Sequence, residues 1–471
     1  MPKIEHAIQS AIDAKGQAGA EAKAHFALSR QGKNVIVLML DRAINGYLPY
    51  IFREKPELRR QFAGFTYYPN VVSFGEHTNF GAPAIFGGYE YTPAEMNRRV
   101  SEPLVDKHNE ALKVMPVLFD EAGFDVTVCD PPYANYSWVP DLSIFDAYPH
   151  IKSYVTEKGQ FSSALPFQDV QGRQLNQVWS RNFFCYSLMK ISPTFIQSRI
   201  YQDGIYYKPN SLALQRIQGS SRAYGQRASF MTSYAVLVSL PDMTRVTDEE
   251  QNTFLSMSNM TAHEHTLLRE PEYEPALSVD NAEYDREHLD RFILNGRKLH
   301  VETDYQMTHY HVNMAAMLQL GRWMDYLREQ GVYDNTRIII IADHGRGLRQ
   351  FDDMAFEIGT DSSGEILDIM AFNPLFLVKD FDSQEFMTDT SFMTTADVPT
   401  IALDGLIENP TNPFTRQSIN NQSKFTSNQL ITSSHIWVTQ ENNGNTFLPG
   451  IWYSVHDNIF DPGNWENIGE H

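Results

Sequence analysis

The sequence predicts an α/β protein in which a central, mostly parallel sheet is flanked by helices. Two runs, Asn34–Leu40 and Arg337–Ala342, are apolar almost throughout, as is typical of strands buried on both faces of a sheet. Between them, a segment of helical periodicity at 102–122 is followed by a strand-like segment at 124–129. This alternation of strand, helix and strand is typical of a parallel sheet with covering helices.

Strands are predicted where short apolar runs end at polar residues, and helices where apolar residues recur every three to four positions. Gly123 and Gly331 are plausible helix stops. The predicted elements, in chain order, are one or two short helices within 1–33, strands at 34–40 and 67–74, a helix at 102–122, strands at 124–129, 235–240 and 252–257, a helix at 305–330, and strands at 337–342, 374–379, 434–438 and 451–455.

Changes of composition along the chain predict its domains. By length alone, 471 residues would allow about three domains. Residues 1–33 are polar and Ala-rich and are expected to form a helical lead-in. Residues 34–404 carry the strand and helix pattern of one catalytic domain. From 405 to 471 Asn, Thr, Gly and Pro become frequent, which predicts a small C-terminal β-rich subdomain packed on the catalytic domain.

The charge and the apolar runs exclude some classes of function. A net charge of −20 argues against nucleic-acid binding, which needs clustered Lys and Arg. It does not exclude an anionic substrate, because a bound metal can invert the local field. No apolar run approaches the roughly 18 residues that a membrane-spanning helix needs, and the first 33 residues do not resemble a signal peptide. As it stands, the chain is expected to be soluble.

The cysteines say little about function. Only Cys129 and Cys185 are present, and neither lies in a CxxC pattern, so a zinc site built from cysteines is not expected. Whether the two form a disulfide stays open.

Polar residues end two of the predicted strands. Asp343 and His344 follow the Ile-rich strand, and Asp41 follows the first strand. Ligands of open α/β sheets bind beyond the carboxyl ends of strands, and a carboxylate with an imidazole suits a divalent metal. Alone, Asp41 would more simply cap a helix or pair with Arg42. Its occurrence together with Asp343 and His344 favours a shared metal site.

Thr78 lies in the segment Gly75–Ala84, just before Asn, Gly and Pro. Its simplest interpretation is a helix N-cap. The functional interpretation uses the same place: a hydroxyl at a helix N-terminus lies in positive potential, and beside a divalent metal it can lose its proton and act as a nucleophile.

Four histidines lie near predicted strand and helix ends, and an aromatic-rich segment spans 133–138. Each histidine is most simply a surface or hydrogen-bonded residue, and spacing alone assigns none of them. The aromatic segment either lines a substrate cleft or belongs to the core. The candidates for substrate contact in these groups are His263, His265, His309, His311 and Trp138.

These motifs, in this order, resemble the alkaline phosphatase superfamily, and specifically its sulfatase-like branch of lipoteichoic acid synthase and the phosphoethanolamine and phosphoglycerol transferases. The resemblance covers roughly 34–405. Its anchors are the strand ending at Asp41, the segments 78–83, 260–263 and 341–345, and the later segment 395–400.

The resemblance implies one divalent metal held by Asp41, Thr78, Asp343 and His344, with Thr78 as nucleophile. His263 matches the histidine that binds substrate and donates a proton. Manganese is the first expectation, with zinc or magnesium as alternatives. In the transferases Glu is common at the position of Asp41, so metal identity stays open.

The implied reaction transfers a phospho-alcohol group from a phospholipid donor to a glycan or lipid acceptor through a phosphothreonine. Such domains usually lie outside the cytoplasmic membrane, behind transmembrane helices, so membrane association is expected of a full-length protein. The chain is either an excised domain of this kind or a soluble relative that acts as a hydrolase.

Four alternatives stand beside this transferase. The first is a phosphodiesterase or phosphatase of the same fold. A sulfatase is disfavoured, because it needs a Cys or Ser in a C/S-x-P-x-R segment, whereas this chain has Thr78 and no following Arg. A two-metal site that adds Asp304 with His309 or His311 matches poorly. The last alternative is a non-catalytic glycan- or lipid-binding module.

Overall fold

The computed structural model describes residues 25–165, 183–201, 215–216, 221–224, 226–360, 366–433 and 444–471. Most of the predicted helical lead-in, 1–33, lies outside these ranges, and its described part contains a strand, β1 (Phe26–Ser29), rather than a helix. The predicted strand at 434–438 also lies outside them. Within the described ranges, no helix combines the length and the apolar character that crossing a membrane requires.

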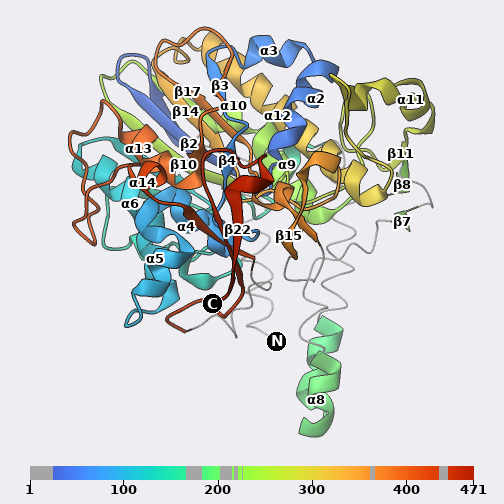
Figure 1. The fold of residues 1–471 in the computed structure, drawn as a ribbon, viewed down its shortest axis with the longest axis horizontal. Coiled ribbons are helices and arrows are strands. Elements are labelled where there is room, and N and C mark those ends of the chain that lie inside the picture. Colours follow the sequence, from blue (N-terminus) through green and yellow to red (C-terminus); the bar gives the residue numbers. More distant parts are fainter. Residues whose placement is uncertain are drawn as a thin grey trace, which may run out of the picture.

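A central sheet of eight strands organises the molecule, as Figure 1 shows. Its strand order is β18 (Met387–Thr388), β3 (Phe65–Tyr67), β17 (Phe376–Lys379), β14 (Thr336–Ile341), β2 (Asn34–Leu40), β10 (Thr253–Asn259), β5 (Asp125–Cys129) and β6 (Lys152–Tyr154). Only β17 runs antiparallel to its neighbours. The predicted fold class, a mostly parallel sheet in an α/β protein, is therefore confirmed.

Helices cover both faces of this sheet (Figure 1). Alternate residues of β2 point to opposite sides: Ile36 and Leu38 join a core with helices on one face, and Val35 and Val37 join a core on the other. Both faces of β2 are thus buried, which explains its continuous apolar run. The helices are α2 (Leu48–Glu54), α3 (Glu57–Gln61), α4 (Thr78–Gly87), α5 (Pro93–Arg98), α6 (Leu104–Glu121), α8 (Thr194–Tyr201), α9 (Ala228–Val238), α10 (Leu240–Met243), α11 (Ala282–Glu287), α12 (Asp304–Glu329), α13 (Val398–Leu403) and α14 (Ser423–Thr426).

Most of the predicted elements that fall in the described ranges are present, and one is wrong. The helix predicted at 305–330 is α12, whose start is fixed by a capping box between Thr303 and Gln306. The strand predicted at 235–240 is instead the end of α9 and the start of α10. Its apolar run is that of a buried helix, which a run of this length cannot distinguish from a buried strand.

Several small sheets surround the central one, and the last of them is the predicted C-terminal β element. This element pairs β20 (Gln429–Ser433), β21 (Ile451–Val455) and β22 (Trp465–Glu470) in antiparallel fashion. The domain division at residue 404 stays a prediction. The other small strands are β9 (Thr244–Thr247) beside β1, β19 (Met393–Thr394) beside β4 (Val71–Val72), β12 (Ile293–Leu294) beside β13 (Arg297–Lys298), β15 (Ala355–Thr360) beside β16 (Ile366–Asp368), and β7 (Gln215–Arg216), β8 (Arg222–Tyr224) and β11 (Ser278–Asp280) together.

Candidate metal centre and active site

The register between β2 and β14 brings two carboxylates to the same edge of the sheet. The two strands are parallel, and Ile341 lies opposite Met39. Asp343 and Asp41 each follow two residues later, so both emerge at the carboxyl end of the sheet. Both are buried, with 0% and 4% of their surface exposed. The strand-end pattern in the sequence thus located this pair correctly.

Asp41, Asp343 and His344 form a group suited to a metal ion. One ligand atom from each lies within 4.8 Å of the other two. His344 Nε2 is 3.6 Å from Asp343 Oδ2 and 3.9 Å from Asp41 Oδ1. Neither Asp41 Oδ1 nor Asp343 Oδ2 accepts a hydrogen bond, although both atoms are buried. Two buried carboxylates that each keep one oxygen without a partner are costly unless a cation neutralises them, so these residues fit a divalent metal.

The electrostatics of the group agree with this fit. Burial, and next the charge of Asp343, raise the pKa of Asp41 to about 7. Burial lowers the pKa of His344 to about 4, so its ring is neutral near pH 7. The Nδ1–H of His344 donates to the carbonyl oxygen of Gly345 at 2.7 Å, which leaves the lone pair of Nε2 directed at the carboxylates.

Thr78 lies beside these ligands as the first residue of α4. Its hydroxyl donates a long hydrogen bond of 3.5 Å to Asp41 Oδ2. His77, and not Thr78, occupies the N-cap position, and no side chain caps this helix end. The interpretation of Thr78 as an N-cap is therefore wrong, because its hydroxyl faces the carboxylates and not the backbone.

A glycine sets the distance between α4 and the metal ligands. A Cβ atom on Gly81 would lie only 2.0 Å from the carbonyl oxygen of Asp343, so the helix can approach this closely only with glycine here. We expect Gly81→Ala to push α4 away and to weaken metal binding at least tenfold, measured by calorimetry with manganese. Gly444→Ala is the control, because nothing lies within 4 Å of its Cβ position. Unchanged affinity in Gly81→Ala would contradict this role.

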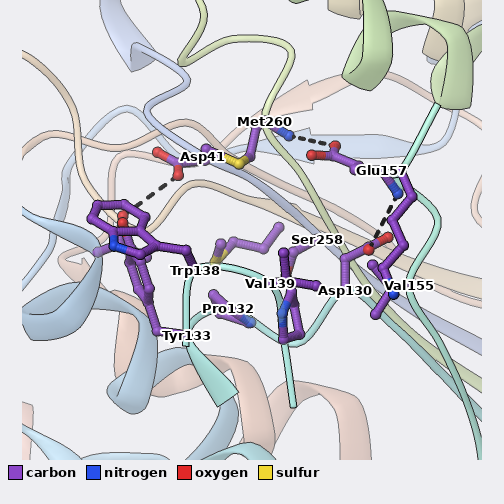
Figure 2. Close-up of a pocket in the computed structure, with 14 residues that line it drawn as sticks. Asp41, Asp130, Pro132, Tyr133, Trp138, Val139, Val155, Glu157, Ser258 and Met260 are labelled. Atoms are coloured by element: carbon purple, nitrogen blue, oxygen red, sulfur yellow. Dashed lines mark hydrogen bonds between the residues drawn. The ribbon is translucent and has the colours of Figure 1, made fainter. Parts of the chain in front are cut away.

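A cavity of about 150 Å³ opens beside Thr78 and Asp41 (Figure 2). Tyr133 and Trp138 lie in its wall, with their rings in an edge-on contact at 5.4 Å between centroids. Trp138 is 75% exposed, so it is not a core residue. Its place in the wall agrees with the cleft-lining interpretation, and its contact with substrate stays a prediction.

Two acidic residues in this cavity wall are absent from the sequence-based candidates. Asp130 follows β5, and Glu157 follows β6. Burial raises the pKa of Asp130 to about 6 and that of Glu157 to about 8. Glu157 accepts hydrogen bonds from the Asn259 side chain and the Met260 backbone at 2.9 and 3.0 Å. Asp130 carries the same strand-end signal as Asp41, whereas nothing in the sequence marks Glu157.

Three of the four candidate histidines lie near the metal ligands or near residues beside them. His263 follows β10 and is close enough to lower the pKa of Asp41 electrostatically, although burial and Asp343 are larger causes and raise it. His265 stacks on His309 at 4.9 Å and contacts Arg227 Nη2 at 3.0 Å. His309 is fully buried, and burial lowers its pKa well below the ordinary value.

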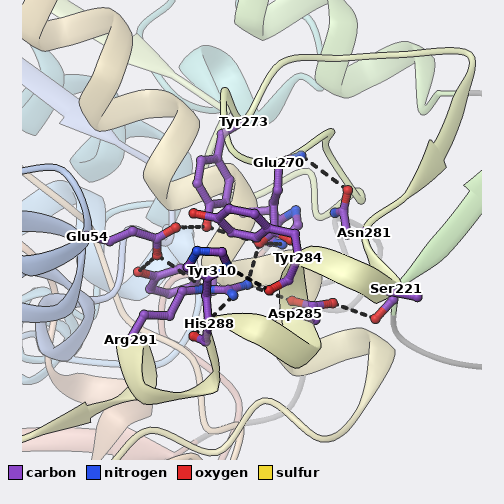
Figure 3. Close-up of polar contacts among 12 residues, drawn as sticks. Glu54, Ser221, Glu270, Tyr273, Asn281, Tyr284, Asp285, His288, Arg291 and Tyr310 are labelled. Carbon is purple, nitrogen blue, oxygen red and sulfur yellow. Dashed lines mark hydrogen bonds and ion pairs between the residues drawn. The ribbon is translucent and has the colours of Figure 1, made fainter.

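His311 is placed differently from the other three. Its Nε2 lies 3.2 Å from Glu270, and its Nδ1 accepts a hydrogen bond from the backbone of Leu268. Glu270 belongs to a buried ionic network around Arg291, which also pairs with Asp285 at 2.6 Å (Figure 3). This network joins α12 to the loops beside α11, so the contacts of His311 are those of a structural residue.

The remaining sequence-based candidates are settled by similar observations. Asp304 does not join His309 or His311 in a second cluster: in the described part of the chain, the group of Asp41, Asp343 and His344 is the one set of three such ligands. Cys129 and Cys185 are not bridged, and Cys129 is buried.

Comparisons with known proteins give likenesses to solved structures alone. No family model matches the sequence, and no curated protein matches it. The chain is similar to a protein in the alkaline phosphatase superfamily from Vibrio parahaemolyticus, with 12% identity, 92% of this chain and 77% of that chain covered, and a TM-score of 0.42. It is similar to the lipoteichoic acid synthase LtaP from Listeria monocytogenes, with 9% identity, 90% and 82% covered, and a TM-score of 0.40.

It is also similar to the phosphonate monoester hydrolase of Agrobacterium radiobacter, with 13% identity, 90% of this chain and 86% of that chain covered, and a TM-score of 0.46.

Proposed function

We propose that the protein is a metal-dependent transferase that moves a phospho-alcohol group through a phosphothreonine at Thr78. The observation that supports it most is the Thr78 hydroxyl 3.5 Å from Asp41, in a group where Asp41 and Asp343 each have one buried oxygen without a hydrogen-bond partner. Asp41, Asp343, His344 and Thr78 would hold one divalent ion. When bound, such an ion supplies Lewis acidity and lowers the pKa of a neighbouring hydroxyl.

In the proposed transfer reaction, each of these residues has a role. Asp41 Oδ2 accepts the hydrogen bond of the Thr78 hydroxyl and orients its oxygen. The Thr78 hydroxyl releases its proton to water, its oxygen attacks the phosphorus of a phosphodiester, a new O–P bond forms, and the bond from phosphorus to the departing alcohol breaks. His263 donates the proton that this alcohol requires. A second hydroxyl then gives its proton to His263 and attacks the phosphothreonine. The bond from phosphorus to the Thr78 oxygen breaks, and this oxygen takes a proton from water, which restores Thr78 and completes the transfer.

The proposed donor is a phospholipid with a glycerol or ethanolamine head group, and the acceptor is a glycan or a lipid. The cavity beside Thr78 supports this choice of head group. Its wall combines the aromatic faces of Tyr133 and Trp138 with the acidic side chains of Asp130 and Glu157. The setting that we propose is a cell-envelope one, outside the cytoplasmic membrane. Manganese is the proposed metal, with zinc or magnesium as alternatives.

Mass spectrometry of the intact protein tests this mechanism. With manganese and phosphatidylglycerol or phosphatidylethanolamine, we expect an adduct on Thr78 whose mass identifies the head group. Adding a sugar acceptor should discharge it onto the sugar, whereas a hydrolase would release it to water at the same rate with or without the sugar. No adduct with any donor under these metal-replete conditions would overturn the proposal.

A further inference from the structure

Two arginines flank the metal ligands without being needed to hold a metal. Arg42 follows Asp41 directly, and Arg346 follows His344 by two residues. The backbone N–H of Arg42 donates to Asp343 Oδ1 at 3.1 Å, and its φ of 62° is left-handed, which is uncommon for a residue other than glycine. A residue held in this conformation beside a reactive group is a candidate for function.

Both guanidinium groups lack partners. The Nε atoms of Arg42 and Arg346 are buried and donate no hydrogen bond, and neither side chain forms an ion pair with any described residue. Arg291, which is buried, does have such a partner, since it pairs with Glu270. A buried donor without a hydrogen-bond partner is costly, so these two half-buried arginines are expected to receive an anion from outside the chain.

The arginines stand close to the metal ligands but do not form part of the cavity wall. Neither is among the residues that line the cavity beside Thr78. Arg42 interacts electrostatically with Asp41 first, and then with Arg346, Tyr305 of α12 and Asp343. Both arginines also act on His309, whose buried Nε2 has no hydrogen-bond partner while its Nδ1 donates to the carbonyl of Tyr305 at 2.8 Å.

We propose that Arg42 and Arg346 bind a second anionic group of the substrate, a phosphate or diphosphate carried by one of the two alcohols. This inference rests on the proposed function, which places the reacting phosphorus at Thr78. Because that phosphorus must lie against the hydroxyl at the cavity, an anion at the arginines is a separate group. The planar fork of a guanidinium matches phosphate oxygens in a bidentate way, and two of them together suit a doubly charged group.

Calorimetry with a matched pair of ligands tests this subsite. Propane-1,3-diol bisphosphate should bind the manganese-loaded protein at least about tenfold more tightly than 3-hydroxypropyl phosphate, and high salt should reduce the difference. Arg42→Asn, which suits the left-handed backbone, and Arg346→Gln should each remove most of this preference, while binding of 3-hydroxypropyl phosphate changes less than about threefold. Arg59→Gln, on the exposed surface of α3, is the control and should retain the full preference.

The outcomes separate this inference from the proposed function. Equal affinities for the two ligands in the parent protein would overturn the subsite. An equal loss of affinity for both ligands in the arginine variants would overturn it too, because the arginines would then contact the reacting phosphorus group. Arg42→Lys keeps the charge and should retain part of the preference even if Arg42→Asn folds poorly. If no adduct forms on Thr78 but the protein still prefers the bisphosphate, the proposed mechanism is wrong and the anion subsite is still supported.

Discussion

Replacing Thr78 by valine is expected to lower turnover of a fluorescent phosphatidylglycerol by at least about a thousandfold, because the reacting oxygen is removed while the branched shape is kept. The side chain is buried beside the metal ligands, so valine fills the same space. The hydroxyl makes one long hydrogen bond, to Asp41, so its loss should lower the free energy of unfolding by about 1 kcal/mol or less. Thr78→Val should therefore lose nearly all of its turnover while its free energy of unfolding changes little.

The matched control for this change is Thr78→Ser, which keeps a hydroxyl and should keep measurable turnover and the covalent adduct. Metal affinity of Thr78→Val, measured by calorimetry, should fall far less than turnover, since Asp41, Asp343 and His344 remain. Turnover of the valine variant above about a tenth of the parent value would show that Thr78 is not the nucleophile.

The ligand cluster was predictable because it follows from strand ends in a parallel sheet. Asp41 and Asp343 each stand where an apolar strand stops, and the pairing of β2 with β14 then makes their meeting a geometric consequence. Thr78 joined them in the prediction only through the family resemblance, since a Thr before a helix has a simpler interpretation. The structure replaced that interpretation when it placed the hydroxyl on Asp41.

Other parts of the site depend on contacts that no local pattern records. Glu157 reaches the site because β6, which precedes it, pairs with β5 at the end of the sheet. The missing hydrogen-bond partners of Arg42 Nε and Arg346 Nε follow from the positions of all the neighbouring residues, which the sequence does not give. The misassigned helix at 235–240 has the same origin. Its apolar run reflects burial against both the sheet and α12, and burial alone does not choose between helix and strand.

The stability of the metal-free protein should fall as the pH rises from about 4 to about 7, and Asp41 should cause much of this. Burial first, and then Asp343, raise the pKa of Asp41 from its ordinary 3.8 to about 7 in the folded state. Below pH 4 the folded and unfolded chains both hold this proton. Between pH 4 and 7 the unfolded chain has released it and the folded chain has not. The free energy of unfolding therefore decreases with pH, by up to about 4 kcal/mol from this group.

Urea unfolding at pH 5 and pH 8, with EDTA or with saturating manganese, measures this effect. Asp130 and Glu157 also have raised pKa values, through burial first, so the informative quantity is the difference between the parent and Asp41→Asn. Without metal, the asparagine variant should lose less stability between the two pH values, because it has no proton to release at this position. With manganese, the parent should gain most at pH 8, where no proton competes for Asp41, and the variant should gain little. If the free energy of unfolding changes equally in the two proteins under all four conditions, Asp41 neither keeps its proton in the folded state nor binds a metal. The proposed metal centre, on which the transfer chemistry depends, would then be rejected.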